Sequence, residues 1–294
     1  MKKMITYSII IPNRNNHELL NRLLNSIPIR EDIQIIIVDD QSDDSYLNEY
    51  PGMLRSNVKI IFCKERKGAG AARNIGIKNA SGKWLLFADS DDFYNSNAFN
   101  VLDKHKNEDV DIFFFNVNSV DSISLKKSTR DKNYGKYINM FLKGKDNNAE
   151  YIRFRKWEPW FKMFKRDFVI NNKLQYEEIP RCNDMAFNLK ASYLAKTFGA
   201  TMEKLYCVTT NLNSITKTKI SKEVFWVCIQ SEMKKNYLYR IINHKMWQST
   251  YLYIVLCLIK NNGLFETVDF MIMLFKRRKE LLFYRNNLYK FFQR

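Results

Sequence analysis

The chain has 294 residues, of which 46% are apolar and 14% aromatic, so it can bury a sizeable core and is not an intrinsically disordered tail. Its 48 basic and 31 acidic residues give a net charge of +17, which favours an anionic partner: nucleic acid, acidic lipid headgroups or a phosphorylated small molecule. Its five cysteines form no C-x-x-C pair, which indicates neither a disulfide framework nor a zinc site and fits a reducing cytoplasm.

The first 115 residues alternate between strand-like and helix-like patterns. Apolar, strand-like runs occupy 5–11, 33–38, 58–62, 83–88 and 110–115, and helical patterns occupy 17–26 and 70–80. Such alternation predicts an α/β fold with a Rossmann-like, mostly parallel sheet flanked by helices. Ligands of these sheets bind beyond the carboxyl ends of the strands.

The second half of the chain gives weaker signals. Residues 118–150 predict a loop and then a helix, 182–195 a helix, and 204–210 a last strand. The segment 151–166 interleaves six basic residues and one acid with aromatics, and we interpret it as partly core rather than as a nucleic-acid surface. From residue 222 onward, long helical patterns replace the alternation. We therefore predict an α/β domain at 1–215 and a helical C-terminal region at 216–294.

No apolar run is long enough to span a bilayer. The longest late runs, 251–259 and 270–275, fall far below the ~20 residues that are needed. The basic and apolar start of the chain ends at residues 12–14 without a small-residue cleavage site, so it predicts a first buried strand and not a signal peptide. We expect a cytoplasmic protein that is soluble or peripheral on the inner face of the cell membrane.

Polar residues follow three of the predicted strands, at 12–15, 39–42 and 89–92. In the last group, Asp89 and Asp91 stand at positions i and i+2, which point the same way in an extended segment. Two such carboxylates suit a hard divalent cation, Mn²⁺ or Mg²⁺, which prefers oxygen ligands and bridges to diphosphate oxygens. The alternative is that these acids only cap a turn.

Two further motifs leave alternatives open. Asp40 follows a buried strand, where it either caps a helix or accepts hydrogen bonds from a nucleobase or ribose. The glycine-rich stretch 68–76 has Arg73 where a dinucleotide fingerprint needs its third glycine, and the chain has no Walker A sequence. The simpler interpretation of this stretch is a flexible helix entry.

Four motifs stand in order: P-x-x-N at 12–15, V-D-D-x-S at 38–42, A-R-N-x-G-I-x-x-A-x-G at 72–82 and D-x-D-D at 89–92. Together they resemble the family-two glycosyltransferases of the GT-A fold, strongly over 5–95 and more weakly to about 195. The resemblance implies a nucleotide-sugar donor, a divalent metal ion and inversion at the anomeric carbon. Residues 1–215 are then the catalytic domain.

The resemblance also assigns the donor site. Pro12 and Asn15 match residues that line the nucleotide pocket, and Asp40 matches the carboxylate that reads the base. Arg73 matches a residue that faces the diphosphate or the ribose. Asp89 and Asp91 match the D-x-D that holds donor and metal, with Asp91 as the direct metal ligand.

On the acceptor side, Asp184 matches the acid of the family's E-D motif, which acts as catalytic base. Trp160 and Lys162 are assigned to the acceptor. The chain departs from the family at Arg14, where an aromatic residue is common, and at Asn183, which replaces the glutamate of E-D. We expect Asn183 to serve as the N-cap of the helix at 182–195.

The resemblance therefore implies an inverting, metal-dependent transferase that moves a sugar, with UDP as the expected carrier, to a glycan or lipid-linked acceptor in bacterial surface-polysaccharide synthesis. The alternatives are a nucleotidyltransferase that makes sugar nucleotides and a non-catalytic sugar-nucleotide or nucleic-acid binder. Residues 222–294 hold 13 basic and 5 acidic residues, so their helices either lie on an anionic membrane or form a bundle for packing or dimerisation.

Overall fold

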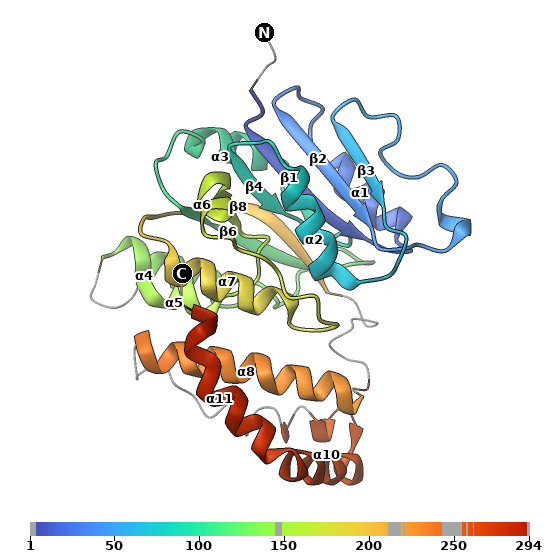
Figure 1. Ribbon diagram of the computed structural model, residues 1–294. Coiled ribbons are helices and arrows are strands. Elements are labelled where there is room, and N and C mark those ends of the chain that lie inside the picture. The colour runs from blue at the N-terminus through green and yellow to red at the C-terminus, as the bar shows by residue number, and fades with distance from the viewer. Residues whose placement is uncertain are drawn as a thin grey trace.

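The structure is a computed structural model, and it describes residues 4–144, 149–210, 219, 221–242, 255–256, 258–260 and 262–292. Its centre is an eight-stranded sheet with the order β3-β2-β1-β4-β7-β6-β8-β5, covered by helices (Figure 1). The fold class predicted from the alternating patterns is therefore confirmed. The predicted domain boundary at 215/216 lies outside the described residues.

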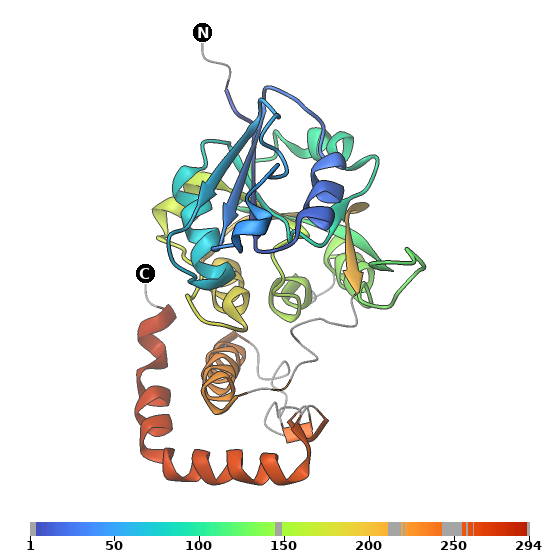
Figure 2. The same ribbon diagram turned by 90° about the vertical axis from the view of Figure 1, so that its right-hand side faces the viewer.

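The N-terminal half of the sheet is parallel. Its strands are β1 (Tyr7–Asn13), β2 (Ile33–Asp39), β3 (Val58–Phe62) and β4 (Trp84–Phe87). Helices α1 (His17–Asn25) and α2 (Gly68–Asn79) lie on opposite faces of these strands (Figure 2). Because both faces are covered, the strands are apolar runs with little alternation. All six elements lie where the sequence predicted them, within two residues at either end.

Close approach of α2 to the sheet depends on a glycine of the A-R-N-x-G motif. A Cβ atom at Gly76 would lie 2.3 Å from Cγ2 of Ile10 on β1, so a larger residue would push the helix away. The same helix begins at Gly68, whose φ of +86° is left-handed and favours glycine. The glycines therefore set the position of α2, which agrees with their interpretation as a helix entry.

The second half of the sheet is mixed. It contains β5 (Phe93–Tyr94), β6 (Ile112–Asp121), β7 (Lys162–Lys165) and β8 (Phe198–Thr210). The sequence did not predict β5 and β7, because these strands have only two and four residues and β7 lies inside the aromatic and basic segment 151–166. Strand β7 joins the two halves, since it pairs antiparallel with β4 on one side and with β6 on the other.

Helices of the second half cover these strands. They are α3 (Ala98–His105), α4 (Tyr134–Leu142), α5 (Ala149–Arg155), α6 (Arg166–Asn171) and α7 (Asn183–Leu194), and a short 3-10 helix, η1 (Asp44–Tyr46), lies in the first half. The segment 151–166 contributes Phe154, Trp160, Phe161, Met163 and Phe164 to the core, each at most 2% exposed. Its interpretation as partly core is thus confirmed.

The C-terminal region is helical, as predicted, with α8 (Lys222–Ile242), α10 (Leu264–Lys276) and α11 (Arg278–Phe292). Helix α8 packs on α7 through a cluster that includes Met185, Leu189, Leu238 and Tyr239. A second cluster, with Phe225, Phe270 and Leu288, joins α8, α10 and α11 to one another. Among the described residues, no helix has both the length and the apolar character that crossing a bilayer requires.

Candidate active site

An acidic loop, residues 89–92, follows β4 at the centre of the sheet. All four residues of β4 are buried, because this strand lies between β1 and β7. The chain leaves the sheet after Ala88, and a carboxylate oxygen from each of Asp89, Asp91 and Asp92 lies within 4.8 Å of the other two. Asp89 and Asp91 are half-buried, and Asp92 is fully buried.

Three residues from two distant elements, β8 and α1, hold the acidic loop. The backbone N–H of Thr209 on β8 donates to Asp92 Oδ1 at 2.6 Å, and its hydroxyl donates to the carbonyl of Asp91 at 2.9 Å. Arg22 on α1 donates to the same carbonyl at 2.5 Å, and Asp89 N–H donates to the Tyr206 hydroxyl at 2.9 Å. Sequence reasoning missed Arg22, Tyr206 and Thr209. These contacts join residues 69 to 118 positions apart, so no local pattern could reveal them.

The loop carries more negative charge than its neighbours balance. Burial, and then Asp89, raise the pKa of Asp91, although Arg130 partly offsets them. Burial, and then Asp91 and Asp89, raise the pKa of Asp92, whose Oδ2 atom is buried without a hydrogen-bond partner. An all-carboxylate donor set with an unpartnered buried oxygen fits a hard divalent cation, whose charge would relieve this repulsion. The turn-capping alternative does not account for Asp92 Oδ1, which accepts from Thr209 on β8, 117 residues along the chain.

Arg73 connects the acidic loop to α7. Its side chain is only 7% exposed, and its guanidinium donates to Asp89 Oδ1 at 2.6 Å and to Asn183 Oδ1 at 2.8 Å. The expected N-cap role of Asn183 is wrong, because Asn183 is the first residue of α7 and its amide oxygen accepts from Arg73 instead. The N-cap position belongs to Cys182, whose φ is 58° and whose side chain makes no capping hydrogen bond.

Asp184 follows in the first turn of α7. It is not one of the three clustered carboxylates, but it lies close enough to Arg73 for the two charges to attract each other. Burial raises the pKa of Asp184 to about 6, opposed by Arg73 and reinforced by Glu158 and Asp89. A carboxylate with a pKa of this size is ionised at neutral pH and still basic enough to accept a proton.

The residues assigned to the nucleotide lie at the same edge of the sheet. Both oxygens of Asp40 accept backbone N–H groups at the entry of α2, from Lys67 at 2.8 Å and from Gly68 at 2.9 Å. This is the capping role that the sequence left open, and it does not exclude contact with a ligand. Pro12 is half-buried near the end of β1. Asn15 has a φ of 50°, and its side chain holds Asp43 through two hydrogen bonds of 2.8 Å.

The two residues assigned to the acceptor are buried. Trp160 is 2% exposed and stacks on Tyr206, with ring centroids 5.8 Å apart. Lys162 is fully buried and donates to Asn188 Oδ1 at 2.9 Å, and burial lowers its pKa to about 7. Neither side chain presents a surface in this structure, so their assignment to the acceptor stays a prediction.

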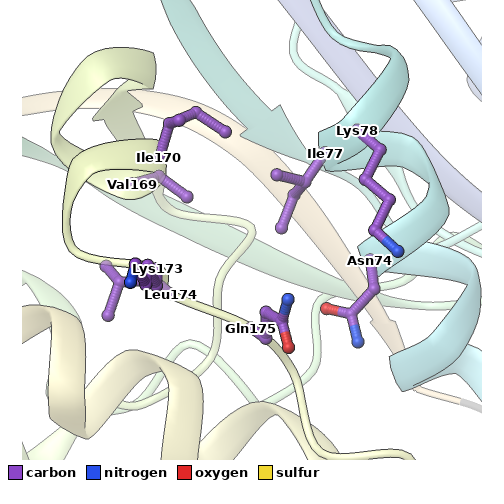
Figure 3. A pocket seen from close by; sticks show the side chains of 8 residues that line it. All are labelled: Asn74, Ile77, Lys78, Val169, Ile170, Lys173, Leu174 and Gln175. Atoms are coloured by element: carbon purple, nitrogen blue, oxygen red, sulfur yellow. The ribbon is translucent and has the colours of Figure 1, made fainter.

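A separate pocket of about 170 Å³ lies between α2 and α6 (Figure 3). Its lining residues come from the second half of α2, from α6 and from the turn after α6: Asn74, Ile77, Lys78, Val169, Ile170, Lys173, Leu174 and Gln175. None of them is a predicted site residue. The pocket is also smaller than the roughly 300–1,000 Å³ of ordinary small-molecule sites. It is therefore not the candidate site.

A protein-family model matches the part of the sequence that forms the acidic loop and the sheet around it. The model of glycosyl transferase family 2 matches residues 8–177, which is more than half of the chain. The chain belongs to glycosyl transferase family 2. The match contains all four motifs and the acidic loop, and it ends before Asn183 and Asp184.

Relatives of this family-2 chain include named enzymes. It is 42% identical over 98 residues to the poly(ribitol-phosphate) beta-glucosyltransferase of Bacillus spizizenii, which is 31% of this chain and 16% of that protein. It is 26% identical over 226 residues to the poly(ribitol-phosphate) beta-N-acetylglucosaminyltransferase TarP of Staphylococcus aureus, which is 72% of this chain and 64% of that protein. The chain thus spans less than two thirds of the length of either relative.

Solved structures show the same fold. Staphylococcus aureus TarS 1–349 in complex with UDP-GlcNAc superposes with a TM-score of 0.58 at 20% identity, covering 87% of this chain and 71% of that one. The mannosyltransferase PcManGT from Pyrobaculum calidifontis, in complex with GDP-Man and Mn²⁺, gives 0.55 at 12% identity, covering 92% and 75%. The family-2 chain therefore has the GT-A fold expected from its motifs.

Proposed function

We propose that this chain is an inverting, metal-dependent glycosyltransferase that moves a sugar from a nucleoside diphosphate sugar to an acceptor and releases the nucleoside diphosphate, with UDP as the first candidate. One observation carries the proposal. The buried arginine Arg73 joins a cluster of three carboxylates at residues 89–92 to a helix start that presents a fourth, separate carboxylate, Asp184. Glycosyl transfer with inversion needs this division between a charged leaving group and a proton acceptor.

The donor side would hold the diphosphate. Asp91, with Asp89 beside it, would bind Mn²⁺ or Mg²⁺, which neutralises the charge that develops on the leaving diphosphate. Arg73 would hold Asp89 in place through its hydrogen bond and would add positive charge near the diphosphate. Asp40, Pro12 and Asn15 would border the nucleotide, since they lie at the ends of β1 and β2.

The acceptor side would hold the base. An acceptor hydroxyl is a poor nucleophile, so a carboxylate must take its proton as it attacks the anomeric carbon. Asp184 is suited to this step, because it belongs to a different element from the acidic loop and has a pKa raised to about 6 by burial. Trp160 and Lys162 would support the acceptor from behind, and their burial predicts an effect on its position rather than direct contact.

The acceptor class follows from the relatives. Several are named for the sugar that they add to poly(ribitol-phosphate), and one relative in Bacillus subtilis is a minor teichoic acid biosynthesis protein. We propose by analogy that this chain acts on a glycan or a lipid-linked saccharide of a bacterial surface polymer, at the inner face of the cell membrane. Its net charge of +17 is compatible with an anionic polymer or a charged lipid carrier.

Two rival functions remain testable. A nucleotidyltransferase wants a glycine-rich loop with a basic residue directly after the first strand, and residues 12–18 read PNRNNHE instead. A non-catalytic sugar-nucleotide binder would have no use for Asp184 beside an intact acidic loop.

The deciding experiment is a donor screen. Binding of a nucleotide-sugar panel is measured by calorimetry in Mn²⁺ and again in excess chelator, and the best donor is then assayed for release of its nucleoside diphosphate with and without acceptor. A transferase releases the diphosphate faster with acceptor, a nucleotidyltransferase forms pyrophosphate from a nucleoside triphosphate and a sugar phosphate, and a binder does neither. Failure of every nucleotide sugar to bind in Mn²⁺ would remove the proposal.

A further inference from the structure

Helix α10 has an apolar face that the described part of the chain leaves uncovered. Thr267 and Phe270 are buried, and Phe270 packs with Phe225 of α8 and Leu288 of α11, so one side of α10 is already packed. Six apolar side chains project on the other side, each at least 44% exposed: Leu264, Phe265, Val268, Met271, Ile272 and Phe275. At 100° per residue these six positions fall within an arc of about 120°. We call this face the outer stripe.

The outer stripe protrudes. Phe265 is 90% exposed and Phe275 68% exposed, so both rings stand out from the surface instead of lining a groove. Helix α10 runs along the end of the molecule opposite the N-terminal strands, with α8 above it in the view and α11 rising from its end (Figure 2). A flat surface can therefore reach the stripe without meeting the sheet domain.

Cations border the stripe at one end. The stripe stops at Phe275, and residues 276–279 read KRRK, of which Lys276, Arg278 and Lys279 are exposed. Arg277 stacks over Trp226 and pairs with Glu280, which fixes the corner between α10 and α11. Phe283, one turn into α11, is 73% exposed on the far side of these cations.

We propose that the outer stripe of α10 and the cations after it dock this chain on an anionic phospholipid bilayer, with α10 lying in the plane of the interface. The helix has 13 residues, which is about 20 Å and too short to cross the ~30 Å hydrocarbon layer. Such a helix lies with its apolar face among the acyl chains and its cations at the headgroups.

The bilayer is favoured over a second copy of the chain by charge. Each chain carries +17, so two copies that meet at this corner bring like charges together, whereas anionic headgroups attract them. The outer stripe would thus be the surface that meets the membrane named in the proposed function. It does not depend on the transfer reaction.

The test is sedimentation of the full chain with vesicles of phosphatidylcholine and phosphatidylglycerol in equal parts, against vesicles of phosphatidylcholine alone. We expect binding to the anionic vesicles that weakens with salt. Phe265→Ser should weaken it about tenfold, because a fully inserted phenyl ring is lost. Leu54→Ser is the matched control, since Leu54 is 101% exposed on the sheet domain and should not matter.

A second pair tests the charge. Lys276→Gln with Lys279→Gln should weaken binding roughly tenfold at low salt. Lys132→Gln with Lys136→Gln changes the net charge equally and should have little effect, because both lysines lie on the sheet domain. Equal binding of the Phe265 and Leu54 variants would overturn the proposal. So would a dimer, measured by light scattering without vesicles, that Phe265→Ser dissociates.

Donor turnover with a soluble acceptor is measured on the same variants and should be unchanged. If no variant or parent chain shows turnover but the vesicle results hold, the docking surface stands and the proposed function fails. If turnover is normal and vesicles are not bound, the docking surface fails and the proposed function stands.

Discussion

The acidic loop and the start of α7 both carry aspartates, but the surroundings of these aspartates differ. Asp89, Asp91 and Asp92 crowd together, and Arg130 offsets their mutual repulsion only in part, so a divalent cation would relieve it further. Asp184 stands apart at the start of a helix, and its burial raises its pKa to about 6. Arg73 donates to Asp89 and to Asn183, so it lies between the proposed metal site and the helix start that carries the proposed base. In the proposed function, the environment of each carboxylate, and not its type, sets its role.

The largest expected effect on turnover comes from a change in the acidic loop. Asp91→Ala should reduce turnover below detection and greatly weaken binding of the nucleotide in Mn²⁺, because the metal loses its principal ligand. Isothermal titration with UDP and Mn²⁺ measures the binding. Asp44→Ala is the control, since Asp44 is exposed and lies outside the loop. Near-normal activity of Asp91→Ala, or an enzyme insensitive to excess chelator, would contradict the metal assignment.

Asp184→Asn tests the carboxylate that stands apart from the acidic loop. This change keeps the shape and removes the basicity, so kcat should fall by roughly 10²–10⁴-fold while donor affinity barely changes. Loss of UDP binding would mean that Asp184 is structural, and a nearly normal kcat would move the base elsewhere, with Glu177 and Glu178 the next acids to test.

The pH profile sharpens the same comparison. Asp184 must be deprotonated to act, so kcat should rise with pH and level off above its pKa of about 6. The Asn variant should lose this rise. The raised pKa also means that the folded chain holds this proton more tightly than the unfolded chain, so ionised Asp184 costs stability above about pH 6. The Asn variant should therefore unfold at an equal or higher temperature at pH 7, which excludes misfolding as the cause of low activity.

Asp40→Ala tests the nucleotide border with a smaller effect. We expect donor affinity to fall about tenfold, the loss of one hydrogen bond to a charged group, while Mn²⁺ binding in the acidic loop persists. The variant also loses the cap of α2, which should cost about 1 kcal/mol of stability. Unchanged donor affinity in a folded variant would leave Asp40 with the capping role alone.

The smallest expected effect concerns the support of the acidic loop. Arg22 donates to two backbone carbonyls, those of Asp91 and Ser122. Arg22→Gln should weaken Mn²⁺ binding severalfold by loosening the Asp91 backbone. Arg55 makes the same kind of contact with the carbonyls of Leu24 and Ile27, away from the acids, so Arg55→Gln should lower stability alone. Equal Mn²⁺ affinity in the two variants would show that Arg22 does not position the loop.

The sequence by itself determined the parallel half of the sheet and the acidic loop. Buried parallel strands are continuous apolar runs, and polar residues that follow them must meet at the same edge. The four motifs also indicated the family, because their glycines and acids stand at fixed places on those strands and on α2. Asp89 and Asp91 could therefore be chosen from their position after a strand, whereas the choice of Arg73 needed the resemblance to the family.

Tertiary structure alone decided which side chains hold those residues in place and how deeply each carboxyl group is buried. Strand β7 pairs β4 with β6 although only four residues form it, and no periodicity appears over so short a run. Arg22, Tyr206 and Thr209 reach the acidic loop from far along the chain, and Asn183 turns to Arg73 instead of capping α7. The raised pKa of Asp184 is likewise a consequence of burial, because a sequence gives the identity of a carboxyl group but not the solvent that packing removes from it.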